Sequence, residues 1–315
     1  MVERMFGMSR VLLTGATGHV GKAVTRQLVM AGIPLLAVGR RQDALERLKE
    51  EVNSSLLATA AVELTQPESI KVVAAEFGPF RKLIHLAAQV DANASLEEHM
   101  SGNLLATISL VACLRDELEQ IVNMSSIEVY GMPNACPIGE DHVTCPETYY
   151  GAGKLASEKF LQVFGLEKGA TVTNLRCSSI YGPGETILRA TTVFLKNAVV
   201  GQPIRIAGDG SDLRDYIFVE DVAVAVLKSM KEKKSGVFNL GGGEPITISD
   251  MAQTIIDISG KNLIVEYVER TKPKYDLALD NSKIFSQIGF KPQTGMTEGL
   301  AAEYQCFLEG ATTRW

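Results

Sequence analysis

The feature that most restricts the fold of this chain is a set of three glycines, three residues apart, near its beginning. Gly15, Gly18 and Gly21 follow the apolar segment Arg10–Thr14, and the amphipathic segment Lys22–Ala31 comes next. A strand, a glycine-rich turn and a helix in this order allow a bound diphosphate to approach a helix N-terminus closely. The sequence therefore predicts a dinucleotide-binding unit here, although the spacing is GxxGxxG rather than GxGxxG.

Strand and helix patterns alternate along the chain that follows. Short apolar runs predict strands, and apolar residues three or four apart predict helices. The predicted strands are Pro34–Val38, Ala60–Leu64, Lys82–Leu86 and Gln120–Met124. The predicted helices are Asp43–Val52, Pro67–Phe77, Leu104–Glu117 and one that begins at Tyr149. This alternation predicts an α/β fold with a Rossmann-type, doubly wound parallel sheet.

The pattern changes after Tyr181. We expect helices at Ala190–Val200, Val219–Met230 and Ile248–Ser259, with a short strand at Pro203–Ala207.

Charge and composition argue against several kinds of partner. The formal net charge of -6 gives no basic surface, so we do not expect nucleic acid to bind. No apolar run approaches the roughly 20 residues that a membrane helix requires. The five cysteines lack CxxC spacing, so we expect reduced thiols, a cytoplasmic protein and no metal site. Residues 1–9 lack a signal-peptide core, so we expect an unstructured extension, with Met8 an equally good start.

Tyr150 and Lys154 lie one turn apart on the helix that begins at Tyr149, and so share a face. Apolar residues at positions 156, 160, 163 and 164 recur at helical spacing, and Gly165 is the expected helix end. An ammonium beside a phenol favours the phenolate, so we expect a lowered pKa for Tyr150, as an acid–base catalyst requires. A Tyr and a Lys four residues apart are also common on structural helices, so the pair alone does not decide.

The end of the second predicted strand bears on the choice of dinucleotide. Arg40 and Arg41 stand where an acidic residue would bind the adenosine ribose hydroxyls, and arginine suits a 2′-phosphate. We therefore favour NADP(H), with NAD as the alternative if the two arginines only begin a solvated helix. Glu63, at the end of the third predicted strand, is expected to reach the adenine edge or to face solvent.

The segment Asn123–Gly131 places two serines at the carboxyl end of a strand, where such sheets bind ligands. With the glycine turn and the Tyr150/Lys154 pair, it resembles the extended short-chain dehydrogenases/reductases, namely the NAD(P)-dependent nucleotide-sugar epimerase/dehydratase family. Further matching motifs are His85–Ala88, Asn103, Tyr181–Gly184, Gly208–Gly210, Arg214–Val222 and Phe238–Gly242. The resemblance covers about residues 10 to 310.

The resemblance implies a catalytic set of Ser126, Tyr150 and Lys154. Ser126 would hydrogen-bond the reacting sugar oxygen, and Tyr150 would exchange a proton with that oxygen while hydride moves to or from the nicotinamide. Lys154 would hold the nicotinamide ribose and lower the pKa of Tyr150. We expect the neighbouring Ser125 to pack or cap instead.

The resemblance also implies the binding residues. Those placed against the cofactor are Gly15, Thr17, Gly18, His19, Val20, Gly21, Arg40, Arg41, Glu63, Leu64, Leu86, Ala87, Ala88, Asn103, Tyr150 and Lys154. His19 would act as a spacer there. Those placed against the substrate are Ser179, Arg214 and Arg270; both arginines would bind the diphosphate, unless they form ion pairs that join domains.

Three positions depart from the family pattern. Ile127 stands where dehydratases carry an acid, and an alkyl side chain cannot protonate a leaving hydroxyl, so we do not expect 4,6-dehydration. Glu128 is either a base for epimerisation or decarboxylation, or a carboxylate bonded to backbone amides. Ser179 replaces a frequent Asn and Ala207 a frequent aromatic residue, which leaves the nucleotide base open.

The resemblance finally implies an organisation and a set of reactions. The nucleotide-binding domain would comprise residues 9–178 and 215–240, and an interleaved substrate domain residues 179–214 and 241–315. A homodimer would form through the helices at 104–117 and 149–164. We expect an NADPH-dependent nucleotide-sugar 4-keto reductase, with a 4-epimerase that retains NAD as the alternative, and a catalytically idle NADP-binding sensor as a third hypothesis.

Overall fold

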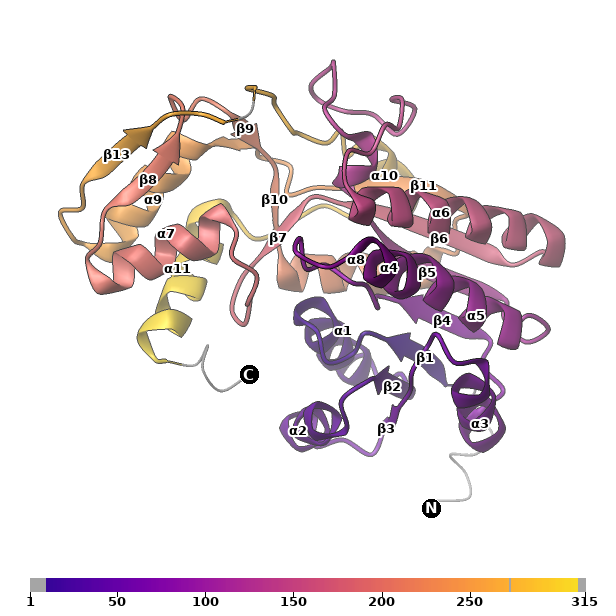
Figure 1. The fold of residues 1–315 in the computed structure, drawn as a ribbon. Helices are drawn as coiled ribbons and strands as arrows, with labels where there is room; N and C mark the ends of the chain where they lie inside the picture. Colours follow the sequence, from indigo (N-terminus) through magenta and orange to yellow (C-terminus); the bar gives the residue numbers. More distant parts are fainter. Residues whose placement is uncertain (1–9, 272, 311–315) are drawn as a thin grey trace.

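The computed structural model describes residues 10–271 and 273–310, in which seven parallel strands form the central sheet (Figure 1). Their order is β11-β6-β5-β4-β1-β2-β3. They are β1 (Val11–Thr14), β2 (Leu35–Gly39), β3 (Leu57–Ala61), β4 (Lys82–His85), β5 (Gln120–Ser126), β6 (Thr171–Cys177) and β11 (Gly236–Leu240). The order reverses between β1 and β4, as in doubly wound folds. The predicted fold class is confirmed. The expected extension at residues 1–9 and the last residues of the expected second domain, 311–315, lie outside the described residues.

Helices cover both faces of the sheet. One face carries α1 (His19–Met30), α2 (Gln42–Val52), α8 (Val219–Glu232) and α10 (Ser282–Ile288). The other carries α3 (Pro67–Phe77), α5 (Ala106–Cys113) and α6 (Tyr149–Lys168). Successive residues of β1 alternate between the two cores, with Leu13 in the first and Leu12 in the second. Because both faces are covered, the strands are largely buried, and β1 and β2 are almost entirely apolar, whereas β5 and β6 also carry buried polar residues.

A smaller region lies beside the sheet, at the upper left of Figure 1. Its core is formed by α7 (Ala190–Val200), α9 (Ile248–Ser259) and α11 (Met296–Leu308), which pack against the paired strands β8 (Ile204–Ala207) and β13 (Val265–Val268). Two further pairs are β7 (Ser179–Tyr181) with β10 (Tyr216–Phe218), and β9 (Leu213–Arg214) with β12 (Ile246–Thr247). The proposed domain division stays a prediction; Ile284 and Ile288 of α10 pack in the core of the central sheet.

The third predicted strand and the helix predicted at 104–117 differ from the elements found. The third strand is Leu57–Ala61 rather than 60–64, because Val62 and Leu64 are buried after the strand has ended and mimic its apolar pattern. The helix predicted at 104–117 is a chain of three pieces, namely α4 (Leu96–His99), the π-helical turn η2 (Met100–Leu105) and α5, which ends at Cys113.

The helix α6 also runs further than predicted. Gly165 lies within it, and the helix ends at Lys168 before Gly169, which has a left-handed conformation with φ +70°. Within the described ranges, no helix is long and apolar enough to cross a bilayer. All five cysteines are free thiols.

Candidate active site

The glycine turn lies at the carboxyl end of β1 and presses against the residues that follow β4. Gly15 has φ +69°, and a Cβ there would lie 2.7 Å from the backbone nitrogen of Ala87. A Cβ at Gly21 would collide with the carbonyl of Gly15. Larger residues would therefore open the turn.

The helix α1 begins at His19, three residues earlier than predicted, so His19, Val20 and Gly21 form its first turn. Gly18 occupies the N-cap, and because it has no side chain it leaves the first amides of the helix without a side-chain cap. The first turn also contains no acidic residue. A first turn with uncapped amides suits a phosphate group. This arrangement fits the diphosphate of a dinucleotide.

Some predicted cofactor residues support this turn through their packing. Leu86, Ala87 and Ala88 directly follow β4, and Leu86 packs against the core of the first sheet face. Asn103 is buried, and its side chain accepts from the amide of Gln89 at 2.9 Å and donates to the carbonyl of the same residue at 3.1 Å. The amide side chain therefore fixes the loop after β4.

Other predicted cofactor residues have protein partners as well. Glu63 accepts hydrogen bonds from the backbone amide and hydroxyl of Thr65, at 3.1 and 2.8 Å. Leu64 is buried in the core of the second sheet face. Thr17 lies against Gly39, at the end of β2. His19 Nδ1 lies 3.4 Å from Glu185, a buried residue after β7 that our sequence reasoning missed.

The two arginines after β2 lie on the surface. Arg41 donates to both carboxylate oxygens of Asp43, at 3.2 and 2.6 Å, and Arg47 donates to the same carboxylate at 2.8 Å. Arg40 is exposed beside them. Asp43 was missed as a partner, although a carboxylate two residues after an arginine at a helix start is a readable signal.

The predicted catalytic residues come together at the carboxyl end of β5. Thr148 caps α6 by accepting from the amide of Gly151 at 3.0 Å. A Cβ at Gly151 would lie 2.7 Å from the carbonyl of Glu128, so glycine lets α6 begin against the 3-10 helix η3 (Ile127–Tyr130). This contact brings Tyr150 to Ser126, whose hydrogen bond partly offsets the rise that burial causes in the pKa of the phenol.

Lys154 is buried next to Tyr150. Its Nζ donates to the carbonyl of Met124 at 2.8 Å and lies 5.9 Å from the centroid of the Tyr150 ring. Burial lowers the pKa of Lys154 to about 8, against a raising effect of Glu158. An amine of this kind is easily deprotonated compared with a lysine in water.

The expected lowering of the Tyr150 pKa is wrong for this structure. Burial raises the pKa of the Tyr150 phenol, and the charge of Glu128 raises it further. Ser126 and Arg189 act in the opposite direction but do not outweigh burial. Tyr150 is therefore a protonated phenol at neutral pH, because its desolvation penalises the phenolate.

Ser125 belongs to a different network, as expected for the serine that does not face the site. The buried Ser125 hydroxyl donates a hydrogen bond to the carboxylate of Glu158. The same carboxylate accepts a hydrogen bond of 2.8 Å from Nη2 of Arg176, a residue of β6. Arg176 in turn lies 4.8 Å from the centroid of the Tyr130 ring. This network attaches α6 to the sheet, and our sequence reasoning missed it because nothing local marks Glu158 as buried.

The neighbours of Ser126 are placed differently from each other. Glu128 accepts a hydrogen bond from the Thr148 hydroxyl at 2.7 Å, so its carboxylate holds the segment that enters α6. Ile127 is buried in an apolar cluster with Val129 and Tyr130.

Arg189, which our sequence reasoning missed, precedes α7. Among the described residues, its buried Nε has no hydrogen-bond partner.

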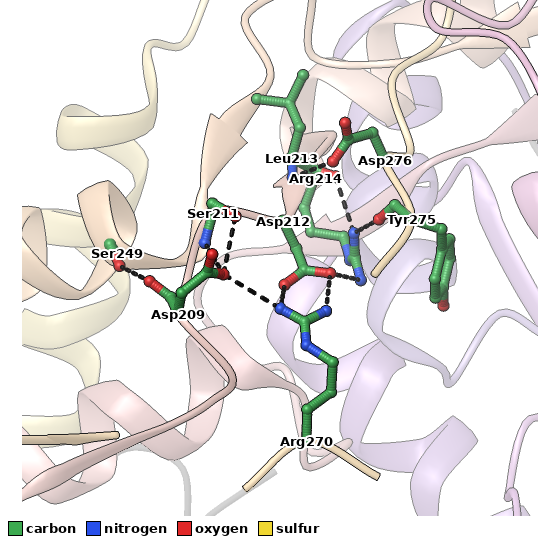
Figure 2. Close-up of polar contacts among 9 residues, drawn as sticks. All are labelled: Asp209, Ser211, Asp212, Leu213, Arg214, Ser249, Arg270, Tyr275 and Asp276. Carbon is green, nitrogen blue, oxygen red and sulfur yellow. Dashed lines mark hydrogen bonds and ion pairs between the residues drawn. The ribbon is translucent and has the colours of Figure 1, made fainter. Parts of the chain in front are cut away.

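The three predicted substrate residues lie in the adjoining segments. Ser179 begins β7 and donates its amide to the carbonyl of Asp215 at 3.2 Å. Arg214 and Arg270 are brought together, but around a carboxylate of the chain itself: both donate to Asp212, as Figure 2 shows.

Comparisons with known proteins bear on this site. The family model described as NAD dependent epimerase/dehydratase family matches residues 11–241. The chain belongs to this family. It is 29% identical, over 95% of its length and 98% of the relative's, to a UDP-glucose 4-epimerase of Mycolicibacterium smegmatis. It is 27% identical, over 92% of its length and 95% of the relative's, to a dTDP-4-dehydro-6-deoxyglucose reductase of Escherichia coli.

A solved structure of the family resembles the fold over nearly the whole chain. The UDP-glucose 4-epimerase of Thermus thermophilus, in complex with NAD, superposes with a TM-score of 0.82 at 25% identity, covering 95% of this chain and 98% of that one. The predicted resemblance to the extended short-chain dehydrogenases/reductases is confirmed. The protein is an enzyme of a family whose members include nucleotide-sugar epimerases, reductases and dehydratases.

Proposed function

We propose that this enzyme reduces the C4 ketone of a nucleotide-diphospho-sugar with hydride from NADPH. The observation that carries the proposal is the grouping of Ser126, Tyr150 and Lys154 at the carboxyl end of β5. In this sheet, β5 is separated from β1 and its glycine turn by β4 alone. A proton source and a dinucleotide cradle therefore share one edge of the sheet.

Each of the three residues has a distinct task in the proposed reaction. Ser126 hydrogen-bonds the sugar oxygen, and Tyr150 passes it a proton. Lys154 orients the ribose of the nicotinamide and takes part in returning a proton to the phenol. When bound, the nicotinamide supplies the hydride. The Tyr150 phenol is protonated at neutral pH, so it carries the proton that reduction of a ketone requires.

The residues around this group argue against elimination of water. Ile127, at the position where the resemblance places an acid in dehydratases, is buried among apolar side chains and has no proton to give. Glu128 has its carboxylate bonded to Thr148, and we propose that it tunes the Tyr150 phenol through its charge. The proposed use of NADPH relies on the positive charges of Arg40 and Arg41 at the tip of β2.

A 4-epimerase is the second candidate, supported by the 29% identity to a UDP-glucose 4-epimerase. The same three side chains would serve that reaction, which oxidises the sugar and reduces it again on the other face. Purified protein separates the two. Oxidation of one NADPH for each 4-keto sugar supports the reductase, whereas bound NAD and interconversion of C4 epimers without net consumption support the epimerase. Binding of NADPH without turnover of any sugar would leave only the sensor.

We also propose that two copies of the chain associate through α6 and its neighbours. Two of the apolar residues that recur at helical spacing lie on the surface of α6, where Phe160 is 52% and Val163 61% exposed. The buried face of α6 instead carries Lys154, Ser157 and Glu158 along with Leu161 and Phe164. An exposed apolar helix face of this kind is typical of an interface.

A further inference from the structure

The side chain of Asp212 fills the fork of Arg270. Arg270 Nη1 donates to one carboxylate oxygen at 2.8 Å, and Nη2 donates to the other at 2.7 Å (Figure 2). The same carboxylate lies 3.5 Å from Nη2 of Arg214. One buried carboxylate therefore contacts both of the guanidinium groups that the family resemblance assigns to the diphosphate of the substrate.

Both arginines make further contacts in the same cluster. Arg270 Nη2 also contacts Asp209 at 3.2 Å, and its Nε lies against Gly208. Arg214 Nη1 donates to the carbonyls of Leu213 and Tyr275, at 2.9 and 2.6 Å, while its guanidinium lies 4.5 Å from the centroid of the Tyr275 ring. Figure 2 shows these side chains converging from β9, from the segment before it and from the segment after β13.

A carboxylate and a phosphate bind an arginine in the same way, because each accepts two parallel hydrogen bonds from the planar guanidinium. They cannot fill one fork together, and two anions in one partly buried site repel each other. The side chain of Asp212 is only 7% exposed, so water screens this repulsion weakly. Arg270 lowers the pKa of Asp212, so the carboxylate stays charged at neutral pH.

We propose that Asp212 is an internal competitor for the diphosphate of the substrate, holding Arg214 and Arg270 until a nucleoside diphosphate displaces it. The inference rests on the proposed function, which requires a nucleotide-diphospho-sugar substrate, and on the expectation that these two arginines bind its diphosphate. It makes Asp212 a residue that sets substrate affinity without touching the reacting sugar. Removal of its charge therefore strengthens binding, which is the opposite of what loss of an ordinary binding or structural residue does.

The test measures the binding of UDP and dTDP to the full chain by calorimetry. We expect Asp212→Asn to bind the nucleotide about tenfold more tightly than wild type, and Asp212→Glu, which keeps the charge, to bind no more tightly than wild type. Asp276→Asn is the matched control, because this carboxylate accepts from the amide of Leu213 in the same cluster. It should leave the affinity within about twofold. Unchanged or weaker binding by Asp212→Asn overturns the inference.

A second variant distinguishes failure of this inference from failure of the proposed function. Arg270→Gln should weaken nucleotide binding more in the Asp212→Asn background than in wild type, because only there is the fork free. If Arg214→Gln and Arg270→Gln have no effect in either background, the proposed diphosphate site is itself wrong. If Asp212→Asn fails to fold, Asp209→Asn serves as the second variant, because Asp209 is an exposed residue whose carboxylate also contacts Arg270. Asp209→Asn is expected to tighten nucleotide binding about two- to threefold. Unchanged or weaker binding there again overturns the inference.

Discussion

The ammonium of Lys154, on α6, donates a hydrogen bond of 2.8 Å to the carbonyl of Met124 in β5. Lys154 is only 3% exposed, and this burial disfavours the charged form of its side chain. The residue is thus held by one backbone oxygen at a site where the folded protein tolerates a positive charge poorly. We expect stability and catalysis to place opposite demands on this side chain.

The first prediction concerns the stability of Lys154→Met as a function of pH. The pKa of Lys154 is about 8 in the folded protein and its ordinary value is 10.5. Between these values the unfolded chain binds more protons, so the stability of wild type rises with pH in this window. The free energy of unfolding of Lys154→Met should therefore exceed that of wild type by up to about 3 kcal/mol at pH 7. This difference should decline towards pH 10.5. Urea unfolding of both proteins at several pH values measures it; a difference that stays constant with pH contradicts the expectation.

The second prediction concerns the phenol of Tyr150. Tyr150→Phe removes the proton donor but keeps the ring, so the rate constant of turnover should fall by roughly 10²- to 10⁴-fold. The affinity for NADPH should remain within a few-fold, as measured by fluorescence titration. Turnover close to that of wild type would reject the role assigned to Tyr150.

The third prediction concerns the choice of cofactor. Replacing Arg40 and Arg41 by Ala should weaken NADPH binding by about tenfold or more and change NADH binding little, because only NADPH carries the 2′-phosphate. Arg115→Ala is the control, since Arg115 pairs with Glu167 and precedes β5, at the opposite end of the strands from the glycine turn. Equal losses for the two cofactors remove the argument for NADPH.

The fourth prediction concerns association of two chains. Phe160→Glu places a charge on the exposed apolar face of α6 and should convert a dimer into a monomer, as read from light scattering after gel filtration. Val72→Glu on α3 is the matched control, because Val72 is similarly exposed, at 63%, on another helix. A wild-type protein that is monomeric at micromolar concentration rules out this interface.

The fifth prediction concerns the buried carboxylate of Glu158. Glu158→Gln leaves Arg176 without its charged partner in the interior and should lower the free energy of unfolding by about 3 to 5 kcal/mol. Glu167→Gln on the same helix breaks only the exposed pair with Arg115 and should cost about 0 to 1 kcal/mol. Urea unfolding compares the two, and similar costs would mean that burial of the Glu158 pair has no energetic consequence.

Much of the architecture was predictable because it depends on local pattern. The strand, glycine turn and helix at Gly15–Gly21 were recognised from spacing, and the helices at Pro67–Phe77, Ala190–Val200 and Ile248–Ser259 were found at the predicted bounds. The strand predicted at 60–64 was misplaced, because residues buried by a turn look the same in sequence as residues buried by a strand.

The sequence by itself determined the parallel sheet, its glycine turn, and that Tyr150 and Lys154 share a helix face. Each of these follows from spacing along a single element, which the chain carries with it before it folds. Only the tertiary structure decided which face of α6 is buried, that the Tyr150 pKa rises, and that Arg270 holds Asp212. These depend on desolvation and on contacts between residues distant in sequence, such as the pair 58 residues apart at Arg270 and Asp212, and no local pattern encodes them.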